Sequence, residues 1–179
     1  MTVAAAPATA QIQVDGVTYT GSQTFQWAVG STHTLTAPSP QAVVGSNQTI
    51  WTGWSNGAAA ASQTIVVPSA AVTYTATYTT LSTDATGLAY NRGTRLFYET
   101  VTITNTGSSA VNGPIEVVFN GLPSGMTLAN AAGTAPNGSP YLTIASSLAA
   151  GSSASVMATF SNPSNVLIPI SLTIYSGAF

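Results

Sequence analysis

Hydrophobic and polar residues alternate along most of this chain with a period of two. Gln11–Val14, Val17–Thr20 and Ser153–Ser161 show the pattern, with an apolar side chain at every second position. Such alternation predicts β-strands with one buried face. No window of about 11 residues has apolar side chains at the i, i+3, i+4, i+7 spacing of an amphipathic helix, so we expect an all-β protein. The predicted strands are residues 11–14, 17–20, 24–29, 32–37, 49–55, 63–67, 72–80, 88–91, 95–105, 115–119, 126–129, 141–144, 153–161 and 168–175.

Turn residues separate these strands. Asp15-Gly16 is the strongest short turn signal, because an Asp-Gly pair tolerates the positive φ that a two-residue hairpin turn requires. Val14 and Val17 should therefore face each other across a hairpin. In the second half, Asn-Gly, Asn-Thr-Gly and Asn-Pro signals recur at the spacing typical of a β-sandwich.

The pattern divides the chain into four parts. Residues 1–10 are small and uncharged, which predicts a flexible lead-in or a strand that docks on a neighbouring molecule. Residues 11–80 hold the first series of strands, and residues 88–179 hold the second. The polar stretch 81–87 lacks alternation and predicts a linker between two domains.

Five segments carry a resemblance to a known family: Val14–Tyr19, Phe25–Trp27, Gly30–Pro38, Trp51–Gly57 and Thr73–Thr80. Through them, residues 11–80 resemble the divergent InlB B-repeat modules of bacterial secreted and cell-surface proteins. The resemblance implies a small β-grasp-like domain with Trp54 in its core. Through Tyr98–Gly107 and Leu148–Phe160, residues 88–179 resemble the immunoglobulin-like domains of large secreted bacterial proteins, which implies an immunoglobulin-like β-sandwich.

Charge is scarce in the sequence. Of 179 residues, 2 are basic and 4 are acidic, so 3% are charged, whereas globular domains have about 25%. Binding to nucleic acid needs a basic stripe that displaces counterions, and two arginines do not form one. With one histidine and neither cysteine nor lysine, the chain is not expected to hold a metal or a cofactor. No apolar run approaches the roughly 20 residues of a membrane-spanning helix, so we expect no membrane insertion.

Aromatic residues are the first candidates for ligand binding. Trp27, Trp51 and Tyr141 could stack on the sugar rings of a glycan, since aromatic faces pack against such apolar surfaces. Trp51 and Trp54 are three positions apart, so they point to opposite faces of a regular strand. Packing in the core is the alternative role, and it is the one we favour for most of these rings.

The few ionisable residues point to structure more than to catalysis. His33 falls on the apolar side of its predicted strand, where we expect a histidine at the edge of the core with one hydrogen-bond partner. No serine lies in a Gly-x-Ser-x-Gly elbow. Glu99 and Glu116 are the one carboxylate pair that neighbouring strands could bring together for glycosidase chemistry. We expect Arg95, Glu99 and Glu116 to form structural ion pairs instead, and we expect no enzyme.

The sequence therefore favours a non-catalytic structural or interaction protein of a bacterial cell surface or a secreted fibre. A surface rich in Ser and Thr and poor in charge is the basis for the extracellular or cell-surface location. The chain is then either a piece of a larger surface protein or the repeating subunit of a fibre. Low charge favours the self-assembling subunit, because subunits without like-charge repulsion can pack through strand edges onto other protein subunits. The alternative is a carbohydrate-binding accessory module of a secreted protein, whose partners would be surface glycans.

Overall fold

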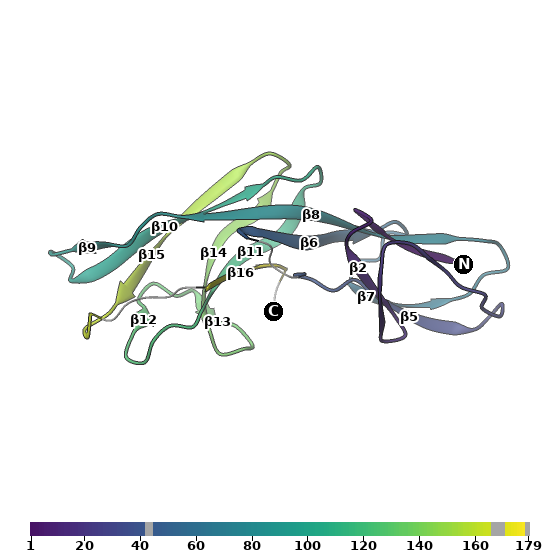
Figure 1. Cartoon of the computed structure of the whole chain (residues 1–179), viewed down its shortest axis with the longest axis horizontal. Coiled ribbons are helices and arrows are strands. Elements are labelled where there is room, and N and C mark those ends of the chain that lie inside the picture. The colour runs from purple at the N-terminus through teal and green to yellow at the C-terminus, as the bar shows by residue number, and fades with distance from the viewer. Residues whose placement is uncertain (42–44, 166–170, 178–179) are drawn as a thin grey trace. The chain divides into compact units, whose positions relative to one another are not determined.

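The computed structural model describes residues 1–41, 45–165 and 171–177 of the chain (Figure 1). Every regular element in these ranges is a strand, which confirms an all-β protein. Within the same ranges, no helix is long and apolar enough to cross a membrane. The strands are β1 (Thr2–Ala6), β2 (Gln11–Val14), β3 (Val17–Thr20), β4 (Gln23–Thr24), β5 (Thr32–Thr36), β6 (Asn47–Trp54), β7 (Ser62–Val66), β8 (Thr73–Ala85), β9 (Ala89–Asn91), β10 (Leu96–Asn105), β11 (Val111–Asn120), β12 (Thr127–Leu128), β13 (Gly133–Thr134), β14 (Pro140–Leu148), β15 (Ser153–Ser161) and β16 (Ser171–Ser176).

The chain divides into two compact units. The first is Met1–Val43 with Thr49–Thr80, and the second is Val44–Gln48 with Leu81–Phe179. The linker predicted at residues 81–87 is wrong, because Leu81–Ala85 continue β8 and pair antiparallel with β10. Leu81 is fully buried, and the β-branched and small polar residues that follow it suit a half-buried strand.

Two sheets form the first unit. In one sheet, β1 lies between β4 and the first part of β8, and it runs parallel to β8. Strand β6 also pairs with β8. The other sheet has the order β3-β2-β5-β7. The core contains apolar side chains from both sheets: Val3, Ala5, Ala10, Ile12, Val14, Leu35, Ala37, Trp54, Ile65, Ala76 and Tyr78.

Residues 1–10 are not a flexible lead-in. Thr2–Ala6 form β1 inside the first unit, and Val3 is fully buried. Alternating burial along β1 places Val3 and Ala5 in the core, so this strand is part of the unit's own packing. Small alanines fit because the neighbouring core position Ala76 is also small.

The Asp15-Gly16 hairpin forms as predicted. Val14 and Val17 are register partners in the β2–β3 ladder, and φ is 50° at Asp15 and 80° at Gly16. The strand predicted at 24–29 is wrong beyond Thr24, because the chain leaves the ladder there and turns at Ala28–Ser31. Phe25 and Trp27 still point to the same side, so alternation of side chains can persist without a partner strand.

The second unit is a β-sandwich-like pair of sheets. One sheet contains β12, β15, β10 and the end of β8, with β9 added beside β10, and the other has the order β13-β14-β11-β16. Phe119 from one sheet meets Phe160 from the other edge to face at 5.8 Å, and both rings are fully buried. Of the strand predicted at 168–175, residues 168–170 lie outside the described residues, and β16 covers the remainder.

Candidate functional site

The turn between β9 and β10 contains both arginines of the chain, Arg92 and Arg95. Asn91 organises this turn, because its Oδ1 accepts hydrogen bonds from the backbone N–H groups of Gly93 (2.9 Å) and Thr94 (3.2 Å). The backbone N–H of Arg95 donates to the Asn91 carbonyl at 2.8 Å. Local hydrogen bonds therefore hold the turn, as expected for an Asn-x-Gly sequence.

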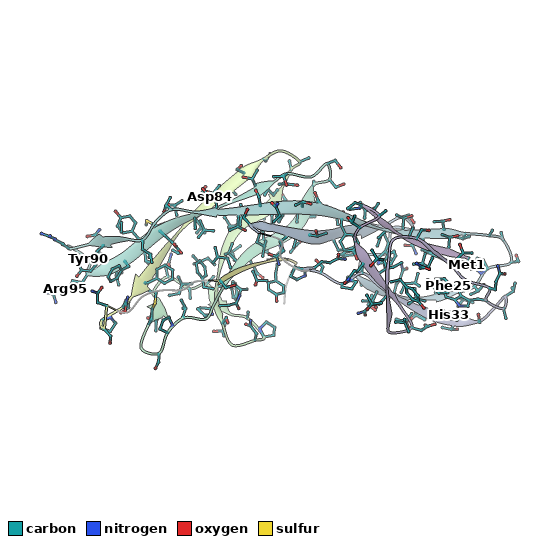
Figure 2. The ribbon with its side chains drawn as sticks, in the orientation of Figure 1. Met1, Phe25, His33, Asp84, Tyr90 and Arg95 are labelled. Carbon is teal, nitrogen blue, oxygen red and sulfur yellow. The ribbon has the colours of Figure 1, made fainter. Side chains whose placement is uncertain are left out.

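A pocket of about 660 Å³ lies beside this hairpin in the second unit. We call it the hairpin pocket; it is lined by Tyr90, Arg95 and Phe97 from the hairpin and by Ser161, Asn162, Pro163 and Asn165 from the segment at the end of β15. Figure 2 shows Tyr90 and Arg95 at the same end of the hairpin. The volume falls within the range of about 300–1,000 Å³ that is typical of small-molecule sites.

Two aromatic rings form the apolar part of the hairpin pocket. Tyr90 and Phe97 are register partners between β9 and β10, and their ring centroids are 4.9 Å apart at 49°. Half of Tyr90 is exposed to solvent (50%), so its ring is accessible to a ligand. The pairing of Phe97 with Phe160 then joins the hairpin to β15, which leads directly into the other wall.

Two residues of the hairpin pocket have unusual backbone conformations. Arg95 has φ of 59° and Asn165 has φ of 48°, both in the left-handed region that favours glycine. Asparagine tolerates this region, but for a residue such as arginine it costs about 1–2 kcal/mol. Strained residues such as Arg95 concentrate at functional sites, so its position in the pocket makes this pocket a candidate site.

The described lining of the hairpin pocket offers groups for binding. Aromatic rings provide apolar contact, Ser161 and Asn165 provide hydrogen-bonding groups, and Arg95 provides a positive charge. No carboxylate or imidazole is among these lining residues. This set can orient a small polar ligand but does not itself include a general acid or base of the usual types.

The predicted ion pairs of Arg95 with Glu99 and Glu116 are wrong. Within the ranges that the structure describes, the one ion pair joins His33 to Asp15. Glu99 follows Phe97 on the inner face of β10, next to the buried Val101, whereas Arg95 lies before the strand in the turn. Both glutamates are buried, whereas Arg95 is exposed.

Both glutamates are buried without full hydrogen bonding. Oε1 of Glu99 and Oε2 of Glu116 have no hydrogen-bond partner among the described residues. Burial raises the pKa of Glu99 and the pKa of Glu116 above their ordinary values, because the interior disfavours the charged form. Glu99 and Glu116 lie on β10 and β11, in the two different sheets of the second unit.

The three predicted ligand-contact aromatics do not form one platform. Trp27 is stacked between Phe25 (4.6 Å) and His33 (3.8 Å) in the first unit. Trp51 is half-buried against the first unit's core, and its indole Nε1 is buried and without a described partner. Tyr141 belongs to β14 of the second unit, and its half-buried ring lies over Gly133.

A hydrogen-bonded group that sequence reasoning missed surrounds His33. Its Nδ1 lies 2.7 Å from Oδ2 of Asp15, and its Nε2 lies 3.0 Å from Oγ of Ser31. We call Ser31, His33 and Asp15 the His33 network. Figure 2 labels His33, which lies near Phe25 in that view. His33 therefore has two partners where one was expected. The His33 hydrogen bond and then the Thr34 N–H lower the pKa of Asp15.

The connectivity of the His33 network resembles a Ser-His-Asp triad. The Ser31 hydroxyl donates to the Ala28 carbonyl at 2.7 Å, so its proton is directed at the backbone. Which nitrogen of His33 donates to Ser31 Oγ or to the Asp15 carboxylate depends on the tautomer of the ring. The network therefore ties the Asp15 turn to β5.

No metal site is indicated in the parts of the chain that the structure describes, where no three His, Cys, Asp or Glu residues cluster. In comparisons with known proteins, no family model matches the chain, and no curated protein and no solved structure matches it. The likeness to B-repeat and immunoglobulin-like modules thus depends on the sequence motifs alone and stays a prediction.

Proposed function

We propose that this protein is a non-catalytic binding module that holds a saccharide in the hairpin pocket. The observation that carries the proposal is the pair of aromatic rings, Tyr90 and Phe97, beside Ser161 and Asn165 in one pocket. A sugar ring has apolar C–H faces that pack on aromatic rings and hydroxyl groups that bind amides and hydroxyls. The aromatic residues of this pocket are not those chosen from the sequence, but they support the same class of ligand, a saccharide.

The proposal places the protein outside the cell, on a bacterial surface or in a secreted assembly. A chain with 3% charged residues and many hydroxyl and amide groups supports this location. In this proposal the first unit is a B-repeat-like module with a β-grasp-like core, and the second is an immunoglobulin-like module. The five motif segments of the first half and the two facing sheets of the second unit support that assignment.

Isothermal titration calorimetry with a panel of neutral and acidic oligosaccharides tests the proposal. Tryptophan fluorescence is a poor reporter, because all three tryptophans belong to the first unit. Tyr90→Ala should weaken binding at least tenfold. Tyr98→Ala is the matched control, since Tyr98 is also exposed on the hairpin (37%) but is not part of the hairpin pocket. Equal affinities of the two variants, or no binding to any saccharide, would contradict the proposal.

Self-association is a second candidate function, which the edges of the first unit favour. The edge strands β3 and β7 contain no charged residue, and each exposes a valine, Val17 (54%) and Val66 (63%). Natural edge strands are usually protected by charges or proline. We propose that these edges pair between copies of the chain to build a fibre or oligomer.

Light scattering tests self-association against the monomer mass of 18.0 kDa. Val66→Lys should shift an oligomer to the monomer, because a lysine on an edge strand opposes pairing. Val29→Lys is the control, since Val29 is equally exposed (68%) but lies outside any strand. A wild-type protein that is monomeric at all concentrations would exclude this candidate.

A further inference from the structure

The positive charge of the protein is concentrated at the hairpin pocket. The chain has a formal net charge of -2, yet both arginines lie within the turn Asn91–Arg95. The four side-chain carboxylates lie outside the pocket lining: Asp15 in the first unit, Asp84 on β8, and Glu99 and Glu116 in buried positions. None of them pairs with Arg95, so no anion among the described residues matches the guanidinium at the pocket.

The backbone at Arg95 adds a second, independent argument. Glycine would occupy φ of 59° without cost, so arginine is an unfavourable residue for folding at this position. Hydrogen bonds from the turn hold the strained conformation and so fix where the side chain starts. The Arg95 side chain is exposed at the pocket, and a guanidinium is suited to bind a carboxylate with two parallel hydrogen bonds.

From these two observations we infer that the hairpin pocket selects saccharides that carry a carboxylate, such as uronic or sialic acids. Tyr90 and Phe97 contact the apolar face of the sugar ring, the amide and hydroxyl groups bind its hydroxyls, and Arg95 binds its carboxylate. This inference depends on the proposed saccharide-binding function and adds the chemical class of the ligand. Two arginines in total are too few for a polyanion such as nucleic acid, which supports recognition of a single carboxylate.

The test compares trigalacturonic acid with its methyl ester, and sialyllactose with lactose, on the full chain by calorimetry. We expect at least one acidic sugar to bind at least tenfold more tightly than its neutral counterpart. Arg95→Gly should abolish this difference while the thermal midpoint stays equal or rises, because glycine relieves the positive φ. Arg92→Ala removes the same charge from the same turn outside the pocket lining and should retain the preference.

The outcomes separate the inference from the function on which it depends. If acidic and neutral sugars bind equally and Arg95→Gly changes nothing, the acidic preference is overturned while saccharide binding stands. If Arg92→Ala and Arg95→Gly reduce affinity equally, the contact is a general charge effect, and the role of Arg95 is overturned. If no saccharide binds but a peptide with a free C-terminal carboxylate does, unlike its amide, both the inference and the proposed function fail.

Discussion

Replacing Glu99 by glutamine should make the stability of the second unit less dependent on pH. Glu99 is 7% exposed, and its Oε1 has no hydrogen-bond partner among the described residues. Its pKa is raised above the ordinary value of 4.5 by burial. At pH values between the ordinary pKa and the raised pKa of the folded state, the folded protein binds more protons than the unfolded protein, so the free energy of unfolding falls as pH rises. Above the raised pKa the loss of stability is complete and no longer changes with pH.

The structure sets the size of this effect. A single carboxyl can change the free energy of unfolding by at most about 1.4 kcal/mol per pH unit. Leaving a buried polar atom unpaired costs about 1–3 kcal/mol. Glu99 keeps some contact with solvent, and glutamine keeps a polar group at the site. We therefore expect Glu99→Gln to gain about 1 kcal/mol at neutral pH, the lower end of that range, and to gain nothing under acidic conditions.

Urea denaturation at a series of pH values measures the effect, followed by circular dichroism because the tryptophans report on the first unit. Glu116→Gln should flatten the pH dependence in the same way, since burial also raises the pKa of Glu116. Asp84→Asn removes an exposed carboxylate on β8 and is the control for the loss of a charge alone. If Glu99→Gln keeps the wild-type slope, or loses stability at every pH, the reasoning is refuted.

Three further substitutions test other contacts. Asp15→Asn removes the carboxylate but keeps a residue that tolerates φ of 50°. At pH values above the ordinary pKa of 3.8 it should lower the free energy of unfolding by under about 1 kcal/mol, and at a pH below the lowered pKa of Asp15 it should change nothing. Unfolding measured across an acid titration checks this. Phe119→Ala should destabilise the second unit by about 3–5 kcal/mol. In a double-mutant cycle with Phe160→Ala, the loss in the double mutant should be smaller than the sum of the two single losses by about 0.5–1.5 kcal/mol. Gly133→Ala should cost about 1–3 kcal/mol in urea denaturation, because the added Cβ would lie 2.8 Å from the Tyr141 ring, and an unchanged midpoint would show that this ring moves freely.

Strands formed by local alternation were predictable from the sequence. The bounds of β2, β3 and β15 agree with the predicted ranges, because alternation and turn residues define a half-buried strand without knowledge of its partner. β1 was not predictable in this way. Its alanines carry little strand propensity, and it forms because Thr2–Ala6 find a parallel partner in residues 73–77.

The candidate site depended on contacts that the sequence does not display. The two walls of the hairpin pocket, residues 90–97 and 161–165, come together through the β10–β15 ladder. Tyr90 therefore gave no signal as part of a site until that pairing was known. The positive φ of Arg95 was likewise hidden, since arginine in a turn ordinarily predicts only a solvated side chain.

The His33 network shows a different limit. Asp15 was correctly assigned to a hairpin turn, but its carboxylate also bonds to His33 and to the Thr34 N–H on β5. The β2–β5 ladder, in which Val14 pairs with Leu35, brings the turn beside His33. Ser31 precedes β5 and lies two positions before His33, and that spacing was the one signal available from the sequence.

The position of β1 has a consequence for the order of folding during synthesis. Thr2 pairs with Thr73, so β1 leaves the ribosome well before β8, the strand that completes its ladder. In that interval one edge of β1 has no partner from its own chain, and such long-range pairing is slow to form. When many ribosomes translate one message, β1 of one nascent chain can meet β8 of another and make the same hydrogen bonds. Crowded synthesis should therefore yield strand-exchanged dimers, and dilute refolding should yield monomers.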